Sequence, residues 1–243
     1  MCIRDRTIFD YEIIPRHKGK NLPVSVMLVA FPQPIIEDYC NVFNESGFKP
    51  LAFEIEAHAF SRAIIPQGER STKMVIDFGK TRTSFIIIKN AQVRFTSTIN
   101  VAGESLSQAL SQALSVSMTE AEAMKKKYNL AKAKANGTDE AFNALFSIIT
   151  AIKKETEHHI NFWNTHPDQY DGVHHGIEEV ILCGGDSNLT GFPEYLSQEL
   201  KLPVRFANPW INIASFEDYI PEIEFKDSLR FAAAIGLALR SFL

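Results

Sequence analysis

The chain has 243 residues, of which 45% are hydrophobic and 22% are charged, so it has the composition of a globular protein with one large domain or two smaller ones. Its formal net charge of −4 argues against nucleic acid as the main partner. No apolar run approaches the roughly 20 residues of a membrane span, and no signal peptide is visible. The cysteines (Cys2, Cys40 and Cys183) have no metal-ligand spacing. We therefore expect a soluble, cytoplasmic protein without direct membrane insertion.

The first part of the chain predicts a small unit of alternating strands and helices. Residues 1–6 show no pattern that leads into the first strand, and we expect them to be a non-native remnant of cloning or assembly. The spacing of apolar residues then predicts strands and helices in the order strand 7–14, strand 24–31, helix 35–46, strand 51–55 and helix 57–65. The first two strands are expected to lie in one sheet. A polar link at 67–72 is the predicted boundary between two lobes.

The second part predicts a three-strand meander, two short helices and one long helix. The ranges are strands 73–77, 83–89 and 92–99, and helices 104–115, 119–128 and 139–164. Thr119 and Glu122 have the spacing of a capping box at the start of the second helix. The remaining elements are strand 177–183, helix 192–201, strand 204–206, an irregular segment at 208–227 and a final helix at 228–242. Gly236 in that helix predicts very close packing against another backbone.

Residues 77–83 (Asp-Phe-Gly-Lys-Thr-Arg-Thr) come after a short apolar strand and predict a hairpin that binds phosphate. Asp77 at the strand end can order a magnesium-bound water, because Mg²⁺ keeps several waters and takes few carboxylates. Gly79 clears space for a ligand, and Thr81, Thr83 and backbone N–H groups can donate to phosphate oxygens. Lys80 lies in the same turn and belongs to the candidate set. The alternative is an ordinary β-turn that uses Asp and Gly for its geometry.

A second glycine corner comes after the apolar run 180–182. Gly184 and Gly185 predict a flat floor for adenine or ribose-phosphate at the start of a helix, and Asp186 and Ser187 complete the candidate set. The alternative is again a plain turn between a strand and a helix. If both corners bind one nucleotide, Gly79 and Gly185 must face the same cleft in the folded chain. The two corners together predict a nucleotide held between two lobes.

In this order the motifs resemble the second half of the actin-like ATPase (ribonuclease H-like) fold, and more narrowly the PilM family of type IV pilus assembly. The residues that carry the resemblance are 29–32, 46–50, 56–63, 121–125, 182–187, 191–192 and 233–240. The resemblance implies an α/β fragment that lacks the N-terminal part of the first lobe. Residues 7–66 would finish the inserted subdomain and first lobe, and residues 67–243 would form the second lobe. We expect such a fragment to bind ATP far more weakly than a longer chain that includes the missing part.

The resemblance also implies a function. Family members are cytoplasmic ATP-binding scaffolds that bind the N-terminal cytoplasmic peptide of a PilN-like inner-membrane protein, with other pilus platform proteins as partners. ATP with Mg²⁺ would act as a conformational ligand, with at most slow hydrolysis, and the protein would be peripheral to the inner membrane through its partners. The family places an acidic residue on the long helix near the nucleoside, and here Glu155 takes that position. His158, one turn on, is a poor substitute for the basic residue expected after it.

Two alternative functions make demands of their own on the sequence. A small-molecule kinase of the same superfold would need a second phosphate hairpin and a base, and an FtsA-like cell-division protein would need a C-terminal amphipathic helix.

Five histidines within a short stretch are expected to lie in a polar loop and on a helix surface rather than in a metal site, because neither adjacent pair has i, i+4 spacing (His158, His159, His166, His174 and His175). A cluster of lysines is expected to form a solvent-exposed helix face (Lys125, Lys126, Lys127, Lys132 and Lys134).

Overall fold

The structure is a computed structural model that describes residues 6–13, 26–130, 140–166 and 176–242. The chain divides into two compact units, which are residues 1–55 with 167–174 (unit 1) and residues 56–166 with 175–243 (unit 2). The division falls between Ile55 and Glu56, before the polar link at 67–72, because the helix that starts at Glu56 packs within unit 2. Within the described ranges, no helix is long and apolar enough to cross a membrane.

Unit 1 consists of a two-stranded sheet and one helix. Strands β1 (Thr7–Ile13) and β2 (Val26–Pro32) lie in one sheet, as predicted, and pair antiparallel; α1 (Gln33–Glu45) comes directly after β2. The predicted strand at 51–55 is wrong, since these residues form neither helix nor strand. Leu51 is 94% exposed. The centroid of the Phe53 ring lies 6.3 Å from that of the Tyr39 ring on α1. The side-chain contact with α1 therefore takes the place of strand pairing.

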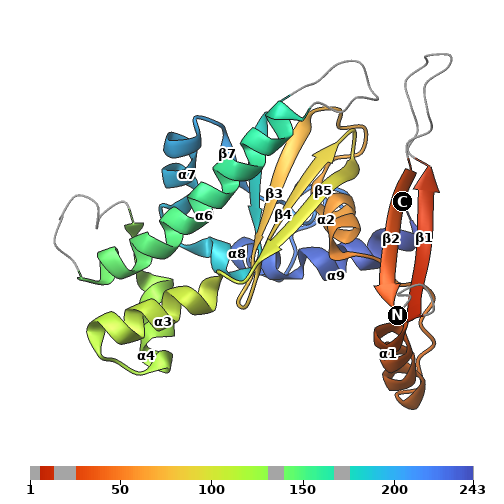
Figure 1. Cartoon of the computed structure of the whole chain (residues 1–243), viewed down its shortest axis with the longest axis horizontal. Helices are drawn as coiled ribbons and strands as arrows, with labels where there is room; N and C mark the ends of the chain where they lie inside the picture. The colour runs from red at the N-terminus through yellow and green to blue at the C-terminus, as the bar shows by residue number, and fades with distance from the viewer. Residues whose placement is uncertain (1–5, 14–25, 131–139, 167–175, 243) are drawn as a thin grey trace. The chain divides into compact units, whose positions relative to one another are not determined.

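Unit 2 is built on a five-stranded mixed sheet (Figure 1). The order of its strands is β5 (Gln92–Ile99), β4 (Thr83–Lys89), β3 (Thr72–Phe78), β6 (Glu179–Cys183) and β7 (Val204–Phe206). The first three form the predicted antiparallel meander, with Asn90 and Ala91 at positive φ in the tight turn between β4 and β5. Strand β6 is parallel to β3, and β7 is parallel to β6. All seven residues of β4 are buried, so this strand lies at the centre of the core.

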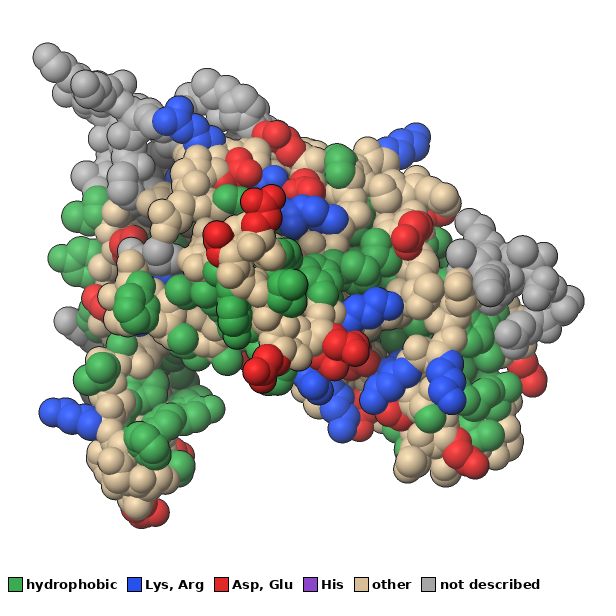
Figure 2. Space-filling model, turned by 180° about the vertical axis from the view of Figure 1, so that it is seen from behind, with side chains coloured by type: hydrophobic (Ala, Val, Ile, Leu, Met, Phe, Trp, Pro, Cys, Tyr) green, Lys and Arg blue, Asp and Glu red, His purple; other side chains and the backbone are tan. Residues whose placement is uncertain are grey.

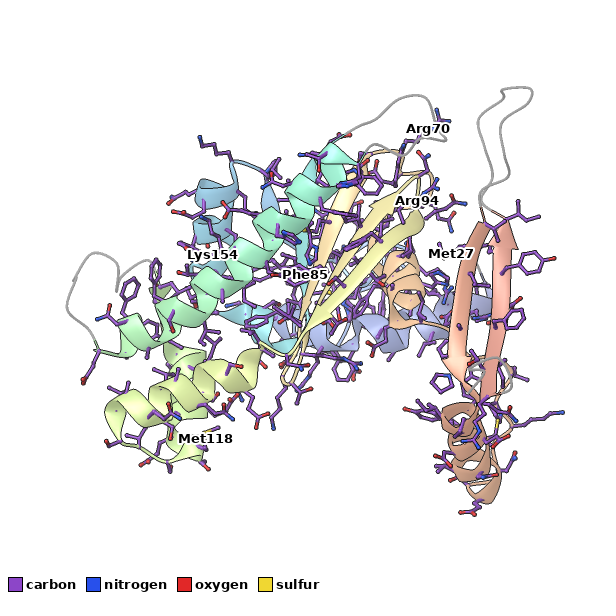
Figure 3. All side chains as sticks on the ribbon, in the orientation of Figure 1. Met27, Arg70, Phe85, Arg94, Met118 and Lys154 are labelled. Atoms are coloured by element: carbon purple, nitrogen blue, oxygen red, sulfur yellow. The ribbon has the colours of Figure 1, made fainter. Side chains whose placement is uncertain are left out.

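Helices cover both faces of the sheet (Figure 1). On one face lie α3 (Gly103–Leu114), α4 (Met118–Lys127), α6 (Glu140–Thr165) and α7 (Phe192–Leu200). Phe85, labelled in Figure 3, projects from β4 and contacts the His159 ring of α6 at 4.9 Å between centroids. The predicted capping box is displaced, because Ser117 rather than Thr119 caps α4 and exchanges hydrogen bonds with Glu120. Glu122 is instead engaged by Ser107 and Lys125.

On the other face, α2 (Glu56–Ile64) packs against α9 (Ala232–Ala238). A Cβ atom at Gly236 would overlap the carbonyl oxygen of Ala59, and the Arg62 Nε–H donates to the Gly236 carbonyl oxygen (3.0 Å). The predicted close backbone approach at Gly236 is therefore confirmed. The predicted single helix at 228–242 is instead interrupted, with α8 (Phe225–Ser228) and a short 3₁₀ turn ahead of α9.

Candidate functional site

The two glycine corners leave the same edge of the sheet. Because β3 and β6 are parallel and Asp77 is in register with Cys183, the turns after these strands begin side by side. Gly184 has φ +89°, and a Cβ atom there would lie 2.5 Å from the Phe78 carbonyl oxygen and 2.6 Å from Asp77 Oδ1. Only glycine fits this position, since both its backbone conformation and its neighbours exclude a side chain. The two corners are therefore in direct contact.

The hairpin between β3 and β4 is tied to the start of helix α3. The Gly79 N–H donates to the Arg82 carbonyl oxygen (3.1 Å), which closes the turn. The N–H groups of Gly103 and Glu104 donate to the carbonyl oxygens of Gly79 (3.0 Å) and Lys80 (2.8 Å). These bonds satisfy two of the free donors of the first helical turn. The side chains of Lys80 and Thr81 are exposed at the tip.

Two hydroxyl groups of the predicted set have partners within the protein. Thr83 Oγ1 donates to the Val101 carbonyl oxygen (2.6 Å), and Ser187 Oγ donates to the Gly184 carbonyl oxygen (2.7 Å). Both residues are fully buried. These two hydroxyl groups therefore donate within the protein and stabilise the backbone of the two corners.

Asp77 lies in an environment that opposes its negative charge. The pKa of Asp77 is raised to about 6, because burial and, to a smaller extent, the Glu56 carboxylate raise it by more than the Arg82 guanidinium lowers it. Arg82 Nη2 is 2.8 Å from Glu56 Oε2 in a half-exposed ion pair. A carboxylate that is disfavoured in this way gains from a nearby cation.

Lys125 contradicts the prediction of a solvated helix face. Its side chain is only 5% exposed, and its Nζ lies 2.5 Å from Asp186 Oδ1 and 2.9 Å from Glu122 Oε2. It also donates to the Gly103 carbonyl oxygen (3.0 Å). A buried ammonium group requires such partners, because its desolvation would otherwise cost several kcal/mol. The prediction holds for Lys126, which is 72% exposed, and Lys132 and Lys134 lie outside the described residues.

Gly103, the first residue of α3, contacts both glycine corners beside Lys125 and Asp186. A Cβ atom at Gly103 would overlap the Asp186 carboxylate, while the Gly103 backbone bonds both Gly79 and Lys125. Glu122 is held from the same side, since the Ser107 hydroxyl donates to its carboxylate (2.6 Å). The start of α3 therefore provides a second connection between the hairpin and the second corner, besides their direct contact.

A cavity of about 400 Å³ opens beside the second corner. Its lining includes Gly185 and Asp186 of the predicted set, together with charged side chains that sequence reasoning missed (Glu122, Lys125, Lys126, Lys226, Asp227 and Arg230). Gly79, Lys80 and Thr81 of the hairpin do not line this cavity, so the cleft expected to be shared by Gly79 and Gly185 stays a prediction. The i, i+3 spacing of Glu122 and Lys125 was the available signal, because it places an acid and a base on one face of a helix. The cavity combines a backbone floor at Gly185 with both signs of charge, and it is of the size that small ligands occupy.

Glu155 is not among the residues that line this cavity. Its carboxylate is 3.2 Å from His159 Nε2. The centroid of the His159 ring lies 5.2 Å from that of Phe95 on β5, so Glu155 lies near the β4–β5 part of the sheet. His159 itself is only 4% exposed, which contradicts the prediction of a surface histidine, and burial lowers its pKa. His174 and His175 lie outside the described residues. Among the residues that the structure describes, no three His, Cys, Asp or Glu side chains converge as a metal site.

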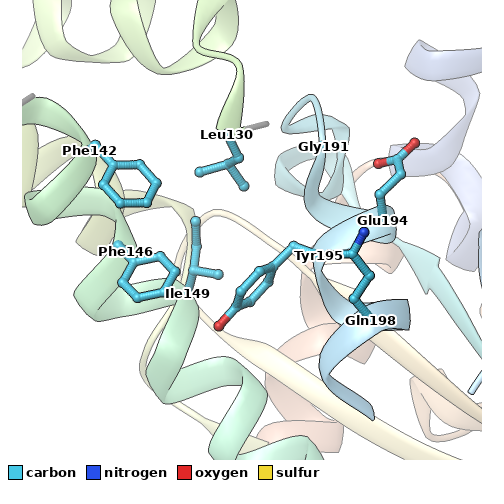
Figure 4. A pocket seen from close by; sticks show the side chains of 8 residues that line it. All are labelled: Leu130, Phe142, Phe146, Ile149, Gly191, Glu194, Tyr195 and Gln198. Carbon is cyan, nitrogen blue, oxygen red and sulfur yellow. The ribbon is translucent and has the colours of Figure 1, made fainter. Parts of the chain in front are cut away.

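A second, smaller cavity of about 70 Å³ is apolar (Figure 4). It lies between α6 and α7, with Phe142, Phe146 and Ile149 facing Tyr195. The Phe142 and Phe146 rings stack at 5.0 Å, and Tyr195 meets Phe146 edge-on at 5.6 Å. A space of this volume accommodates a few carbon atoms and no nucleoside, so it is not part of the candidate site.

Comparison with known proteins supports one family and one fold. The family model described as type IV pilus assembly protein PilM matches residues 3–242. A chain of the solved PilM–PilN type IV pilus biogenesis complex superposes with a TM-score of 0.74, at 19% identity over 98% of this chain and 67% of that chain. MreB5 of Spiroplasma citri bound to ADP gives a TM-score of 0.62, at 17% identity over 87% of this chain and 66% of that chain.

Cell division protein FtsA of Neisseria meningitidis serogroup B is 22% identical over 238 residues, which cover 90% of this chain and 55% of that protein. The chain spans about half the length of the curated relatives it matches. At these identities the solved structures establish the fold alone, and that fold is the predicted α/β actin-like ATPase fold.

Proposed function

Since this chain belongs to the PilM family of type IV pilus assembly proteins, we propose that it is a cytoplasmic, ATP-binding scaffold of the inner-membrane platform. The pilus assembly role is supported by the family and by the similarity to a chain of the PilM–PilN complex. The observation that carries the nucleotide proposal is the direct contact between Gly184 and the end of β3 at Asp77. This contact brings two glycine corners to one end of the sheet, where a phosphate could approach the backbone of the turns closely.

The cavity beside Gly185 suggests how the nucleoside would be held. Glu122 is 39% exposed, and its carboxylate can accept hydrogen bonds from ribose hydroxyl groups. Lys126 and Arg230 are exposed at the same cavity and can balance phosphate charge. Lys125 acts indirectly, since it is buried and holds Asp186 and Glu122 in place. We propose Glu122 in place of Glu155 as the acidic contact to the nucleoside.

Phosphates that extend from the cavity toward the hairpin would meet Gly79, Lys80 and Thr81. Asp77 fits an indirect role in Mg²⁺ binding, because its buried carboxylate beside Glu56 is stabilised by added positive charge. A single carboxylate acting through water also agrees with the preference of Mg²⁺ for few protein ligands. Bound Mg²⁺ would supply neutralisation of phosphate charge. We propose that nucleotide shifts the conformation of the scaffold and is hydrolysed slowly at most.

The proposed protein partner is the N-terminal cytoplasmic peptide of a PilN-like inner-membrane protein. The similar chain of the PilM–PilN complex covers 98% of this chain, which supports a partner of that kind. Binding such a peptide, with other platform proteins, would hold the scaffold at the inner membrane through its partners. A synthetic PilN N-terminal peptide, titrated against a peptide of the same composition in scrambled order, tests this part.

The nucleotide proposal is tested by calorimetric titration of MgATP into the chain and its variants. Gly185→Val adds a side chain to the cavity floor, and its Cβ would lie at an ordinary 3.6 Å from Arg230 Cβ, so folding is expected to be retained. We expect at least tenfold weaker binding for Gly185→Val and severalfold weaker binding for Lys126→Glu. Lys154→Glu, an exposed charge change on α6 (Figure 3), is the matched control. Equal affinity of all four proteins would refute the site.

A further inference from the structure

The segment between β7 and α8 exposes a group of large apolar side chains. We call it the 210–225 face, and its apolar members include Trp210, Ile213, Phe216, Tyr219, Ile220, Ile223 and Phe225. Ile220 is 79% exposed and Tyr219 is 56% exposed. Between them and α8 lies a cavity of about 340 Å³. Contiguous exposure of this kind is uncommon on a protein that acts alone, and it marks interaction sites.

The backbone of the face is anchored at several points. Asn212 Nδ2 donates to the carbonyl oxygens of Arg62 (2.8 Å) and Ile65 (2.7 Å) at the end of α2. At the other end, the buried Ser228 donates through its N–H to the Glu224 carbonyl oxygen (2.9 Å) and through Oγ to the Phe225 carbonyl oxygen (2.6 Å). Asn212 therefore ties the start of the face to α2, and the Ser228 bonds close the helical turn of α8 at its end. Bonds that hold a surface in place before binding lower the ordering cost of binding.

The charge of the face restricts its partner. Residues 208–225 contain four acidic side chains and no lysine or arginine (Glu217, Asp218, Glu222 and Glu224), and all four are exposed. Figure 2, the view from the side opposite to that of Figure 1, shows exposed hydrophobic side chains with acidic and basic ones scattered among them. Anionic lipid and nucleic acid would be repelled by these carboxylates. A second copy placed face to face across a two-fold axis would oppose like charges.

We propose that the 210–225 face docks a basic amphipathic helix of a partner protein. Its apolar side chains would enter the cavity beside Trp210 and Phe216, and its flanking lysines or arginines would pair with the acidic rim. This is the helix-in-groove mode of recognition, in which apolar anchors supply affinity and charge supplies orientation and specificity. The proposal does not depend on nucleotide binding or on the PilN peptide.

The test uses a fluorescent 18-residue helical peptide of leucine and lysine with all leucines on one face, and fluorescence anisotropy as the readout. A peptide of identical composition with the leucines distributed around the helix is the first control, and the helical pattern with glutamate in place of lysine is the second. Ile220→Ser removes the most exposed apolar side chain of the cavity, and the double variant Glu222→Lys/Glu224→Lys reverses the rim. The matched surface controls are Leu237→Ser and Glu178→Lys, both at exposed positions of unit 2.

We expect the leucine–lysine peptide to bind at least tenfold more tightly than either control peptide. Binding should weaken at least tenfold in Ile220→Ser and in the double variant, weaken with added salt, and remain unchanged in the two surface controls. Equal binding by all variants, or equal binding of both lysine peptides, overturns the proposal. A dimer in sedimentation that Ile220→Ser abolishes would assign the face to self-association instead. Binding to phosphatidylglycerol vesicles that Ile220→Ser abolishes would assign it to membrane, and either result also overturns it.

Discussion

Replacing Lys125 with methionine should destabilise the chain although the unbranched apolar stem of the side chain is kept. The substitution removes the ammonium group that bonds Asp186, Glu122 and the Gly103 carbonyl oxygen. Breaking a buried ion pair costs about 3–5 kcal/mol when the remaining charge has no access to water. Here Glu122 is 39% exposed and can be rehydrated, whereas Asp186 is 14% exposed and cannot be fully rehydrated. We therefore expect a loss of about 2–4 kcal/mol in the free energy of unfolding.

Urea unfolding followed by circular dichroism measures this loss. Lys126→Met is the matched control on the next residue, where the side chain is 72% exposed, and it should leave the unfolding midpoint nearly unchanged. The double variant Lys125→Met/Asp186→Asn removes the stranded carboxylate as well, so it should be more stable than Lys125→Met alone. If Lys125→Met matches the control, or if the double variant is less stable than the single one, the buried-pair reasoning is refuted.

Asp77 and Gly236 of unit 2 give three further expected outcomes. The pKa of Asp77 is about 6 in the folded chain against an ordinary value of 3.8, so the folded state loses stability as the pH rises from about 4 to 6. Asp77→Asn should therefore stabilise the chain by up to about 3 kcal/mol at pH 7 and not at pH 3. Urea unfolding at the two pH values measures this difference. Arg82→Met should raise the pKa of Asp77 and Glu56→Gln should lower it in an NMR titration, and shifts in the same direction would contradict the assigned charges. Gly236→Ala should cost about 1–3 kcal/mol in the free energy of unfolding despite the higher helix propensity of alanine, because its methyl group meets the Ala59 carbonyl oxygen; a stabilised variant would show that α9 can shift away.

Periodicity and turn chemistry predicted most of the elements, and in unit 2 most of them bury a regular pattern of apolar residues in the core. The long helix predicted at 139–164 is α6, and the meander of unit 2 forms as predicted. The strand predicted at 51–55 does not form, because a short apolar run does not determine which element its side chains contact. Here the Phe53 ring contacts the Tyr39 ring of α1. The final helix is interrupted for a reason that local pattern does not contain, namely the packing of α8 beside the second glycine corner.

The candidate site was predictable where the backbone determines it and unpredictable where tertiary contacts do. The glycine corners come directly after strand ends, and parallel pairing of β3 with β6 brings them together. The role of Lys125 depends on Asp186, which is remote in sequence, so a basic cluster and a buried ion pair look identical along the chain. Glu155 was placed by resemblance, and the structure pairs it with His159 instead.

The four-residue helix α8 forms a wall of two cavities at once. Glu224 and Phe225 border the cavity of the 210–225 face, while the next two residues, Lys226 and Asp227, border the charged cavity beside Gly185. A displacement of this single helical turn would reshape both spaces together. Binding in one cavity would then be coupled to binding in the other. Each ligand would change the affinity of the chain for the other ligand by the same factor. Adjacent residues would thereby give the chain a short mechanical connection between the proposed nucleotide cavity and the proposed docking face.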